Sequence, residues 1–119
     1  MERCLHKLNY HFFDRNHIHS LLPNEPFVFC ICTDKEAWIV RFSKTEFSFE
    51  KTDLLDEIDV KITTEKQFAL ELLSGNKRLS QLKKYNEIIF EGSFRHFLLL
   101  ESVLWLCREY EVPMEAVSF

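Results

Sequence analysis

The chain has only two glycines and three prolines among its 119 residues. It therefore has no glycine-rich phosphate-binding loop and no nucleophile elbow, because both motifs need several glycines at fixed spacing. A long apolar run is also missing. The stretch from residue 97 to residue 107 contains Glu101 and is far shorter than the roughly 20 residues that cross a bilayer, so we expect a buried helix there.

The chain also lacks an excess of positive charge, since its net charge is -4. A general nucleic-acid binder usually presents a dominant cationic face to phosphates, so we expect no nucleic-acid partner. The first residues, MERCLHKLNY, lack the continuous apolar segment and the small-residue cleavage site of a secretory signal. These features predict an intracellular, cytoplasmic protein.

Cysteine is scarce: Cys4, Cys30, Cys32 and Cys107 are too few and too scattered for a disulfide scaffold, and we expect them to be reduced. Cys30 and Cys32 share one face of a predicted strand, and their C-x-C spacing suits a metal or a redox pair. The alternative, which we favour, is that they act as small buried hydrophobes.

Metal binding and catalysis have little support in the remaining pattern. His17 and His19 are two residues apart, so on a helix they do not share a face, and His11 lies too far around to complete a site. No paired carboxylates suited to acid–base catalysis survive a coarse folding of the chain. We expect no bound metal, no cofactor and no enzymatic activity.

The most abundant feature is phenylalanine, with twelve residues in a chain that is 46% hydrophobic and 29% charged. This is the composition of a globular protein, and the length suits one domain, residues 1–119. So many large aromatic side chains predict either a dense core or an apolar surface for a partner or ligand.

Hydrophobic periodicity divides the chain into nine elements. Leu5, Leu8 and Phe12 recur at helical spacing, which predicts an amphipathic helix between residues 1 and 18. Strands are expected at residues 27–33, 37–43, 46–51, 57–63 and 86–91. The first is apolar throughout, so we place it centrally in the sheet, and the others alternate or are short.

Three more helices are expected after the fourth strand. The first should begin at Thr64, where T-x-x-Q resembles a capping box, and end at Gly75. A short one follows at residues 76–85, and Ser93 caps the last, which runs to about Tyr110. The helical link before the fifth strand allows a parallel crossover. The fold class is α+β, with a five-stranded mixed, mainly antiparallel sheet and helices packed on one face.

This order resembles the sterol carrier protein type 2 family of lipid-transfer domains. The resemblance covers residues 26–107, preceded by the N-terminal helix of residues 1–20. It rests on Asp59-Val60-Lys61-Ile62-Thr63, Phe68, Leu72-Leu73, Gly75, Leu79, Leu82, Ile88, Phe90, Glu91-Gly92 and the apolar helix 98–106. Family members usually have a glycine before the last strand, where this chain has Tyr85-Asn86-Glu87, and asparagine can adopt the same left-handed geometry.

The resemblance implies an apolar tunnel between the sheet and the helices that takes a fatty acid, a sterol or another lipid. Its candidate wall residues are Phe47, Phe68, Leu72, Ile88, Phe90, Phe94, Phe97, Leu98 and Trp105. The same residues would also make an ordinary solid core. In that alternative the chain is a protein–protein interaction domain of the same fold without a ligand.

Two surfaces are candidates for partners. Lys77, Arg78, Lys83 and Lys84 place four cations in a short segment of an acidic chain, which would favour transient contact with an anionic membrane, although a solvated face is the simpler explanation. The third strand, EFSFEK, is expected to be an exposed sheet edge, and such edges can pair two copies of a chain into a homodimer.

Overall fold

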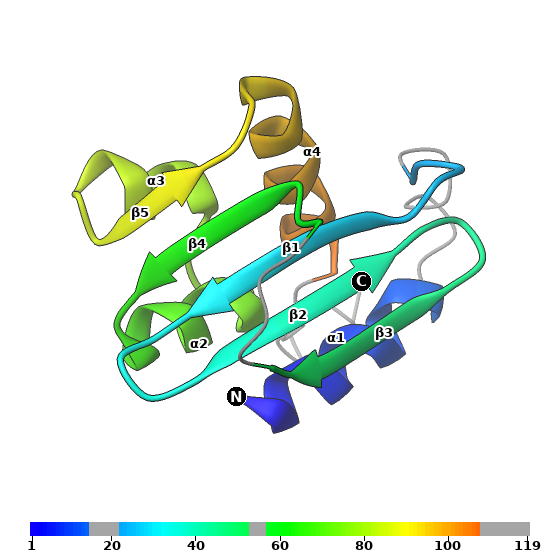
Figure 1. Cartoon of the computed structure of the whole chain (residues 1–119), viewed down its shortest axis with the longest axis horizontal. Helices are drawn as coiled ribbons and strands as arrows, with labels where there is room; N and C mark the ends of the chain where they lie inside the picture. The colour runs from blue at the N-terminus through cyan, green and yellow to red at the C-terminus, as the bar shows by residue number, and fades with distance from the viewer. Residues whose placement is uncertain (15–21, 53–56, 108–119) are drawn as a thin grey trace, which may run out of the picture.

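The computed structural model describes residues 1–14, 22–52 and 57–107, which contain four helices and five strands. The helices are α1 (Glu2–Asp14), α2 (Lys66–Ser74), α3 (Leu79–Lys84) and α4 (Phe94–Leu106). The strands are β1 (Phe27–Cys32), β2 (Ala37–Phe42), β3 (Phe47–Lys51), β4 (Val60–Thr64) and β5 (Ile88–Glu91). This order is the one that the sequence predicts (Figure 1).

The strands form one mixed sheet in the order β3-β2-β1-β4-β5. Three neighbouring pairs are antiparallel, and only β1 and β4 run parallel in this sheet. The predicted α+β class, the mainly antiparallel mixed sheet and the edge position of β3 are therefore confirmed.

The parallel crossover was expected at the wrong place. Thr64, at the end of β4, pairs with Ile88, at the start of β5, so α2 and α3 leave and return at the same end of the sheet. A link that returns to the end it left makes its two strands antiparallel. The parallel pair arises instead because the link after β3 carries the chain past β2 to the far side of β1.

β1 is the central strand, as its uninterrupted apolar sequence predicts. Phe29, Cys30 and Ile31 are all fully buried although their side chains alternate between the two faces of the sheet. On the core face, Phe29 lies opposite Val40 of β2 and Val60 of β4, which are also fully buried. A strand covered on both faces contributes its whole apolar surface to the core.

The helices lie on one face of the sheet, behind it in the view of Figure 1, with α3 beside β5. The predicted amphipathic face of α1 is confirmed: Leu5, Leu8 and Phe12 are buried. The Phe12 ring meets the ring of Phe42 on β2 at a centroid distance of 5.3 Å and that of Phe47 on β3 at 5.0 Å. Helix α1 therefore covers the β2–β3 side of the sheet, and α2 and α4 cover the remainder.

The predicted capping box at Thr64 was wrong. Thr64 belongs to β4, and its hydroxyl donates a 2.7 Å hydrogen bond to the carbonyl of Glu87, just before β5. Glu65 is the N-cap residue of α2, and its side chain makes no capping hydrogen bond. The Thr64 hydroxyl therefore bonds to the chain at the start of β5 instead of capping α2.

Three other predicted end signals are confirmed. Gly75 ends α2 in the left-handed conformation with φ 81°, and Asn86 adopts the expected left-handed geometry with φ 57°. Ser93 caps α4, because its hydroxyl oxygen accepts a 3.1 Å hydrogen bond from the backbone N–H of His96. These residues fix where α2 and α4 meet the sheet.

Gly92, which joins β5 to α4, is required by close packing against the start of β4. A Cβ atom at this position would lie 3.0 Å from Cγ2 of Val60 and 3.1 Å from the carbonyl oxygen of Asp59. Such distances are shorter than ordinary contacts, so a larger residue would push β5 away from β4.

Parts of some predicted elements fall outside the described ranges. These are residues 15–18 of the first helix, with His17 and His19, and residues 108–110 of the last, with the tail after it. Among the helices of the described ranges, none is long and apolar enough to cross a membrane.

Candidate functional site

The predicted wall residues have three kinds of environment. Leu72, Ile88 and Phe97 are buried in the core. Phe47, Phe68, Phe90 and Trp105 are half-buried, and the three phenylalanines pack against that core. Phe94 and Leu98 are exposed to 73% and 48%.

The structure brings three of these aromatic residues together where α4 faces β5. The Phe97 ring lies edge-on to that of Phe90, with centroids 5.0 Å apart, and is stacked with that of Phe94 at 6.4 Å. Phe47 is not part of this group, because it lies on the opposite edge strand and contacts Phe12 of α1. The candidate wall is thus an aromatic cluster near α4, with Phe47 apart from it.

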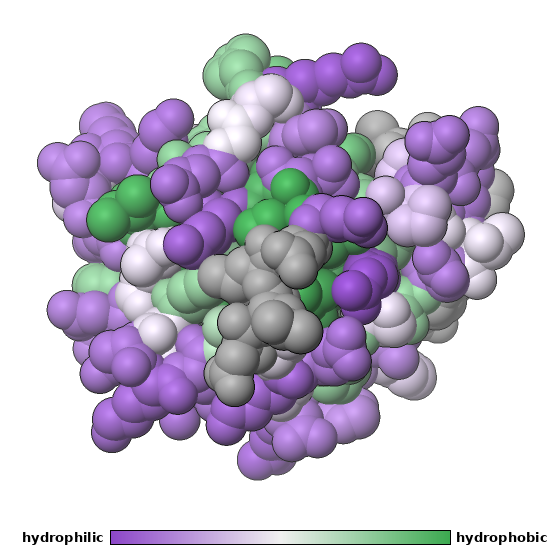
Figure 2. Space-filling model, viewed as in Figure 1, coloured by the Kyte–Doolittle hydropathy of each residue, from purple (hydrophilic) through white to green (hydrophobic). Residues whose placement is uncertain are grey.

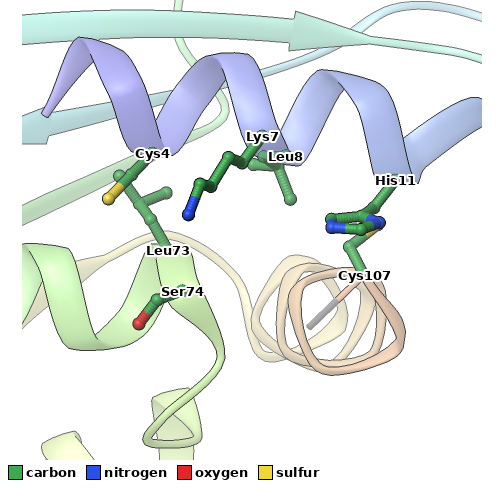
Figure 3. Close-up of a pocket in the computed structure, with 7 residues that line it drawn as sticks. All are labelled: Cys4, Lys7, Leu8, His11, Leu73, Ser74 and Cys107. Carbon is green, nitrogen blue, oxygen red and sulfur yellow. The ribbon is translucent and has the colours of Figure 1, made fainter. Parts of the chain in front are cut away.

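A small hollow lies between α1, the end of α2 and the end of α4 (Figure 3). Its volume is about 60 Å³, and Cys4, Lys7, Leu8 and His11 line it from α1 while Leu73, Ser74 and Cys107 line it from the other two helices. In Figure 3 the Cys107 side chain lies directly beneath the His11 imidazole. The volume suits about two water molecules and is far below the roughly 300 Å³ of a small-molecule pocket.

A larger, open cleft of about 430 Å³ lies where the first turns of α4 pass the start of β1. Phe27 and Leu99 give it an apolar lining, and the charged or polar side chains of Asp59, Arg95 and His96 also line it. The His96 ring lies edge-on to that of Phe27 at 5.2 Å. This cleft joins polar groups at the surface to side chains that pack on the core.

None of the nine candidate wall residues lines either of these two hollows. For the small hollow a signal existed, since residues 4, 7, 8 and 11 have the spacing of one helix face. For the cleft there was no such signal, because Phe27 and Leu99 belong to segments that are far apart in the sequence. Only the register of β1 and the position of α4 bring them together.

A polar cluster joins α3 to α4. Glu101 is 9% exposed on the otherwise apolar α4, and its Oε1 accepts hydrogen bonds from Arg78 Nε at 3.1 Å and from Ser80 Oγ at 3.0 Å. The Arg78 guanidinium also lies 4.9 Å from the centroid of the Trp105 ring. A buried carboxylate is thereby provided with a counter-ion and a hydroxyl donor.

Lys77 holds a second set of carboxylates. Its ammonium is 3.3 Å from Glu71 Oε2 and 3.7 Å from Glu87 Oε2, which ties the end of α2 to the start of β5. The hydrogen bond and the charge of Glu71, helped by Glu87, raise the pKa of Lys77. Two of the four predicted surface cations, Lys77 and Arg78, are therefore already paired with carboxylates of the chain.

The two cysteines of the C-x-C motif lie on the face of the sheet opposite α1 and α4. Their Sγ atoms are 3.4 Å apart, and Cys30 is fully buried. Burial, followed by the hydrogen bond and charge of Cys32, raises the pKa of Cys30 to about 12, against a smaller lowering by Lys61. Cys30 is thus a neutral thiol at ordinary pH, in line with its prediction as a buried hydrophobe.

The raised pKa of Cys30 predicts a loss of stability in alkali. Between pH 9 and pH 12 the unfolded chain releases this proton while the folded chain keeps it, so the free energy of unfolding should fall by up to about 1.4 kcal/mol per pH unit. In Cys30→Ala the decrease in the free energy of unfolding that comes from this thiol should be absent. Cys32→Ala, on the same strand, should retain most of that decrease. Urea denaturation at several pH values measures the difference, and equal slopes for wild type and Cys30→Ala would contradict it.

Across the part of the chain that the structure describes, no group of three or more His, Cys, Asp or Glu side chains is placed to hold a metal ion.

Several solved structures share this fold at low sequence identity. A ubiquinone synthesis protein described as UbiJ-SCP2 matches with a TM-score of 0.64 and 14% identity over 84% of each chain. Sterol carrier protein-2 like-3 from Aedes aegypti matches with a TM-score of 0.62 and 14% identity over 85% of this chain and 92% of its own. The sec-alkylsulfatase Pisa1 from Pseudomonas sp. matches with a TM-score of 0.61 and 9% identity, over 78% of this chain but 14% of the sulfatase.

No protein-family model and no curated protein sequence matches the chain, so the likeness is one of structure. It agrees with the resemblance drawn from the sequence. The chain has the fold of sterol carrier protein 2.

Proposed function

We propose that this domain is a non-catalytic binding or transfer module for an apolar ligand, such as a fatty acid, a sterol or another lipid. The ligand would lie between the core face of the sheet and α4. The observation that carries the proposal is a set of half-buried apolar side chains on α2, β5 and α4, in a fold shared with sterol carrier proteins. The set consists of Phe68, Phe90, Leu99, Trp105 and Leu106.

These side chains are suited to moving aside because water already reaches part of each. Displacing a half-buried residue removes less apolar surface from the core than displacing a buried one such as Leu72. An apolar ligand that takes their place gains about 25 cal/mol for each Å² that it removes from water. Side-chain movement of this kind would supply the volume that the 60 Å³ hollow does not offer.

The open cleft beside Phe27 and Leu99 is the mouth that we propose for the ligand. Its volume of about 430 Å³ lies in the range of small-molecule pockets. Its Arg95 and His96 side chains would stay in contact with a polar head group while the apolar part of the ligand moves along Leu99 towards the core. Transient contact with a membrane would bring the mouth to its ligand. Of the four predicted surface cations, Lys83 and Lys84 are the two that would make this contact, because Lys77 and Arg78 are paired with carboxylates.

The test is to identify lipid that stays with the purified protein by native mass spectrometry, and to titrate the protein with a fluorescent fatty acid. Phe90→Gln should weaken fatty-acid binding at least tenfold, because it places an amide in the proposed wall at the β5 edge. Phe49→Gln is the matched control, being a half-buried phenylalanine on the other edge strand, and should bind like wild type. Thermal denaturation followed by circular dichroism checks that both variants are folded.

Two results would overturn the proposal. One is a wild-type protein that carries no lipid and takes up no fatty acid. The other is a Phe90→Gln variant that is folded and binds the fatty acid as well as the Phe49→Gln variant does.

The alternative is an interaction domain that pairs through β3. The position of β3 at the sheet edge favours it, because an edge strand leaves backbone groups open to a second chain. Exposed Glu46, Glu50 and Lys51 flank this edge, and charged residues there oppose pairing. The homodimer therefore stays a prediction, and sedimentation velocity is its direct test.

A further inference from the structure

The first turns of α4 present an unusual amount of apolar surface to solvent. Phe94 and Leu98 are exposed to 73% and 48%, and they lie one helical turn apart, so they share a face. The Phe94 ring is held in place from behind, because it is stacked with that of the buried Phe97 at an interplanar angle of 7°. A large side chain that is both exposed and supported in this way is a fixed protrusion.

Positive charge lies beside this protrusion. The Lys83 ammonium lies 5.0 Å from the centroid of the Phe97 ring and 5.7 Å from that of Phe90, so α3 brings it beside the same aromatic cluster. Lys84 follows it on α3, and Arg95 follows Phe94 on α4. Within the described ranges none of these three cations has a carboxylate at ion-pair distance, whereas Lys77 and Arg78 do.

We call the set of Lys83, Lys84, Phe94, Arg95 and Leu98 the α4 tip. Figure 2 shows apolar surface at this end of α4, at the top of the view, with hydrophilic surface beside it. The Glu91 carboxylate lies 4.0 Å from Lys61 and so faces β4, whereas Glu25 and Asp59 line the open cleft on the Arg95 side. The α4 tip thus carries three positive charges in a chain whose net charge is -4.

We propose that the α4 tip docks the domain onto an anionic lipid bilayer. An aromatic ring with cations around it suits the head-group layer, where the ring meets the acyl boundary and the cations meet lipid phosphates. Each cation near such a surface strengthens binding by about fivefold, and this attraction extends over about a Debye length. The opposite net charge of the rest of the chain orients the domain with the tip towards the membrane.

A protein partner fits this surface less well. Stable protein interfaces bury about 800 Å² on each side and need a complementary surface, which a protrusion of five residues does not supply. A bilayer needs no such complementarity, because lipids move aside around an inserted ring. The position of Arg95 in both the α4 tip and the proposed mouth adds a reason for docking here. The role of docking in ligand delivery rests on the proposed function, whereas docking of the α4 tip itself does not.

The experiment measures co-sedimentation with vesicles of phosphatidylcholine alone and of phosphatidylcholine mixed with phosphatidylglycerol. Wild type should bind the mixed vesicles at least tenfold more tightly, and added salt should weaken this binding. The variant Phe94→Ser with Leu98→Ser, and the variant Lys83→Gln with Lys84→Gln and Arg95→Gln, should each lose at least tenfold. The tip residues are exposed, so both variants should keep the wild-type circular dichroism spectrum.

Matched controls come from exposed residues elsewhere. Tyr10→Ser removes an aromatic side chain that is 71% exposed on α1, and Arg3→Gln with Lys35→Gln and Lys66→Gln removes three charges. Docking is overturned by a wild type that ignores anionic vesicles, or by controls that lose as much binding as the tip variants. It is also overturned if sedimentation shows a dimer that the Phe94→Ser, Leu98→Ser variant breaks apart, since the tip would then contact a second copy.

The same preparations separate this inference from the proposed function. Protein that binds anionic vesicles but carries no lipid and takes up no fatty acid would refute the carrier function alone. Protein that takes up fatty acid but shows no preference for anionic vesicles would refute docking alone.

Discussion

Replacement of Phe42 by alanine is expected to lower the free energy of unfolding by about 3–5 kcal/mol, as for other buried phenylalanines. Phe42 is 1% exposed at the end of β2. Its ring contacts those of Phe12, Phe27 and Phe29, at centroid distances of 5.3, 5.2 and 6.2 Å. It therefore connects α1 to two strands, and its loss would leave a cavity where these elements meet.

Urea denaturation followed by circular dichroism measures this effect. Phe94→Ala is the matched control, because it removes the same atoms from a side chain that is 73% exposed, and it should cost less than about 1 kcal/mol. If Phe42→Ala costs no more than Phe94→Ala, the aromatic cluster beneath α1 does not stabilise the domain in the way that its contacts indicate.

The burial of Phe42 was predictable from sequence, as was much of the sheet. In β2, Trp38, Val40 and Phe42 recur at every second position, which predicts that they share the core face, because a strand has a period of two. In α1 the spacing of Leu5, Leu8 and Phe12 does the same with the period of a helix. Such patterns are local, so a single sequence reveals them.

Strand partners were less predictable, because the residues of a strand do not determine which other strand pairs with it. The apolar run of β1 predicts that it is central, and it is. Nothing in β4 indicates that it pairs in parallel with β1, or in β5 that it pairs antiparallel with β4. The pairing of β5 with β4 is decided by where the chain returns to the sheet after α2 and α3 have packed.

The candidate site was predicted only in part, and α4 shows why. This helix is apolar on almost every side. Its sequence therefore does not show which residues face the core and which face solvent. Phe94, Phe97 and Leu98 therefore looked alike as wall residues. The structure buries Phe97 and exposes the other two, because α3 and β5 cover only one side of the first turns.

The cations after α2 show a second limit. Lys77 and Arg78 were predicted together with Lys83 and Lys84 as one basic patch. The partner of Arg78, Glu101, belongs to another helix far along the sequence, so no helical or strand spacing reveals that pair. The structure separates the four cations into two that join elements and two that stay at the α4 tip.

Removal of the Arg78 side chain, by Arg78→Ala, is expected to lower the free energy of unfolding by about 2–3 kcal/mol. The Glu101 carboxylate would remain buried on α4 with Ser80 as its one side-chain donor among the residues that the structure describes. Loss of one partner of a fully buried ion pair costs about 3–5 kcal/mol, and the half-exposed position of Arg78 reduces that figure. Urea denaturation of wild type and variant measures the change.

The double variant Arg78→Met, Glu101→Leu is the control that identifies the cause. Without the carboxylate there is no uncompensated buried charge, so the double variant should be more stable than Arg78→Ala by about 1–2 kcal/mol. If the double variant is as unstable as Arg78→Ala, the loss comes from packing against Trp105 and not from the unpaired Glu101.

The same pair bears on ligand uptake, because it ties α3 to the helix that the ligand would have to move. Arg78 and Ser80 hold Glu101 from the α3 side, so α4 cannot separate from α3 at this point without breaking two hydrogen bonds. Under the proposed function, Arg78→Ala should therefore take up the fluorescent fatty acid faster than wild type while being less stable. A variant that is less stable but takes up the fatty acid at the wild-type rate would show that the ligand enters without separating α3 from α4.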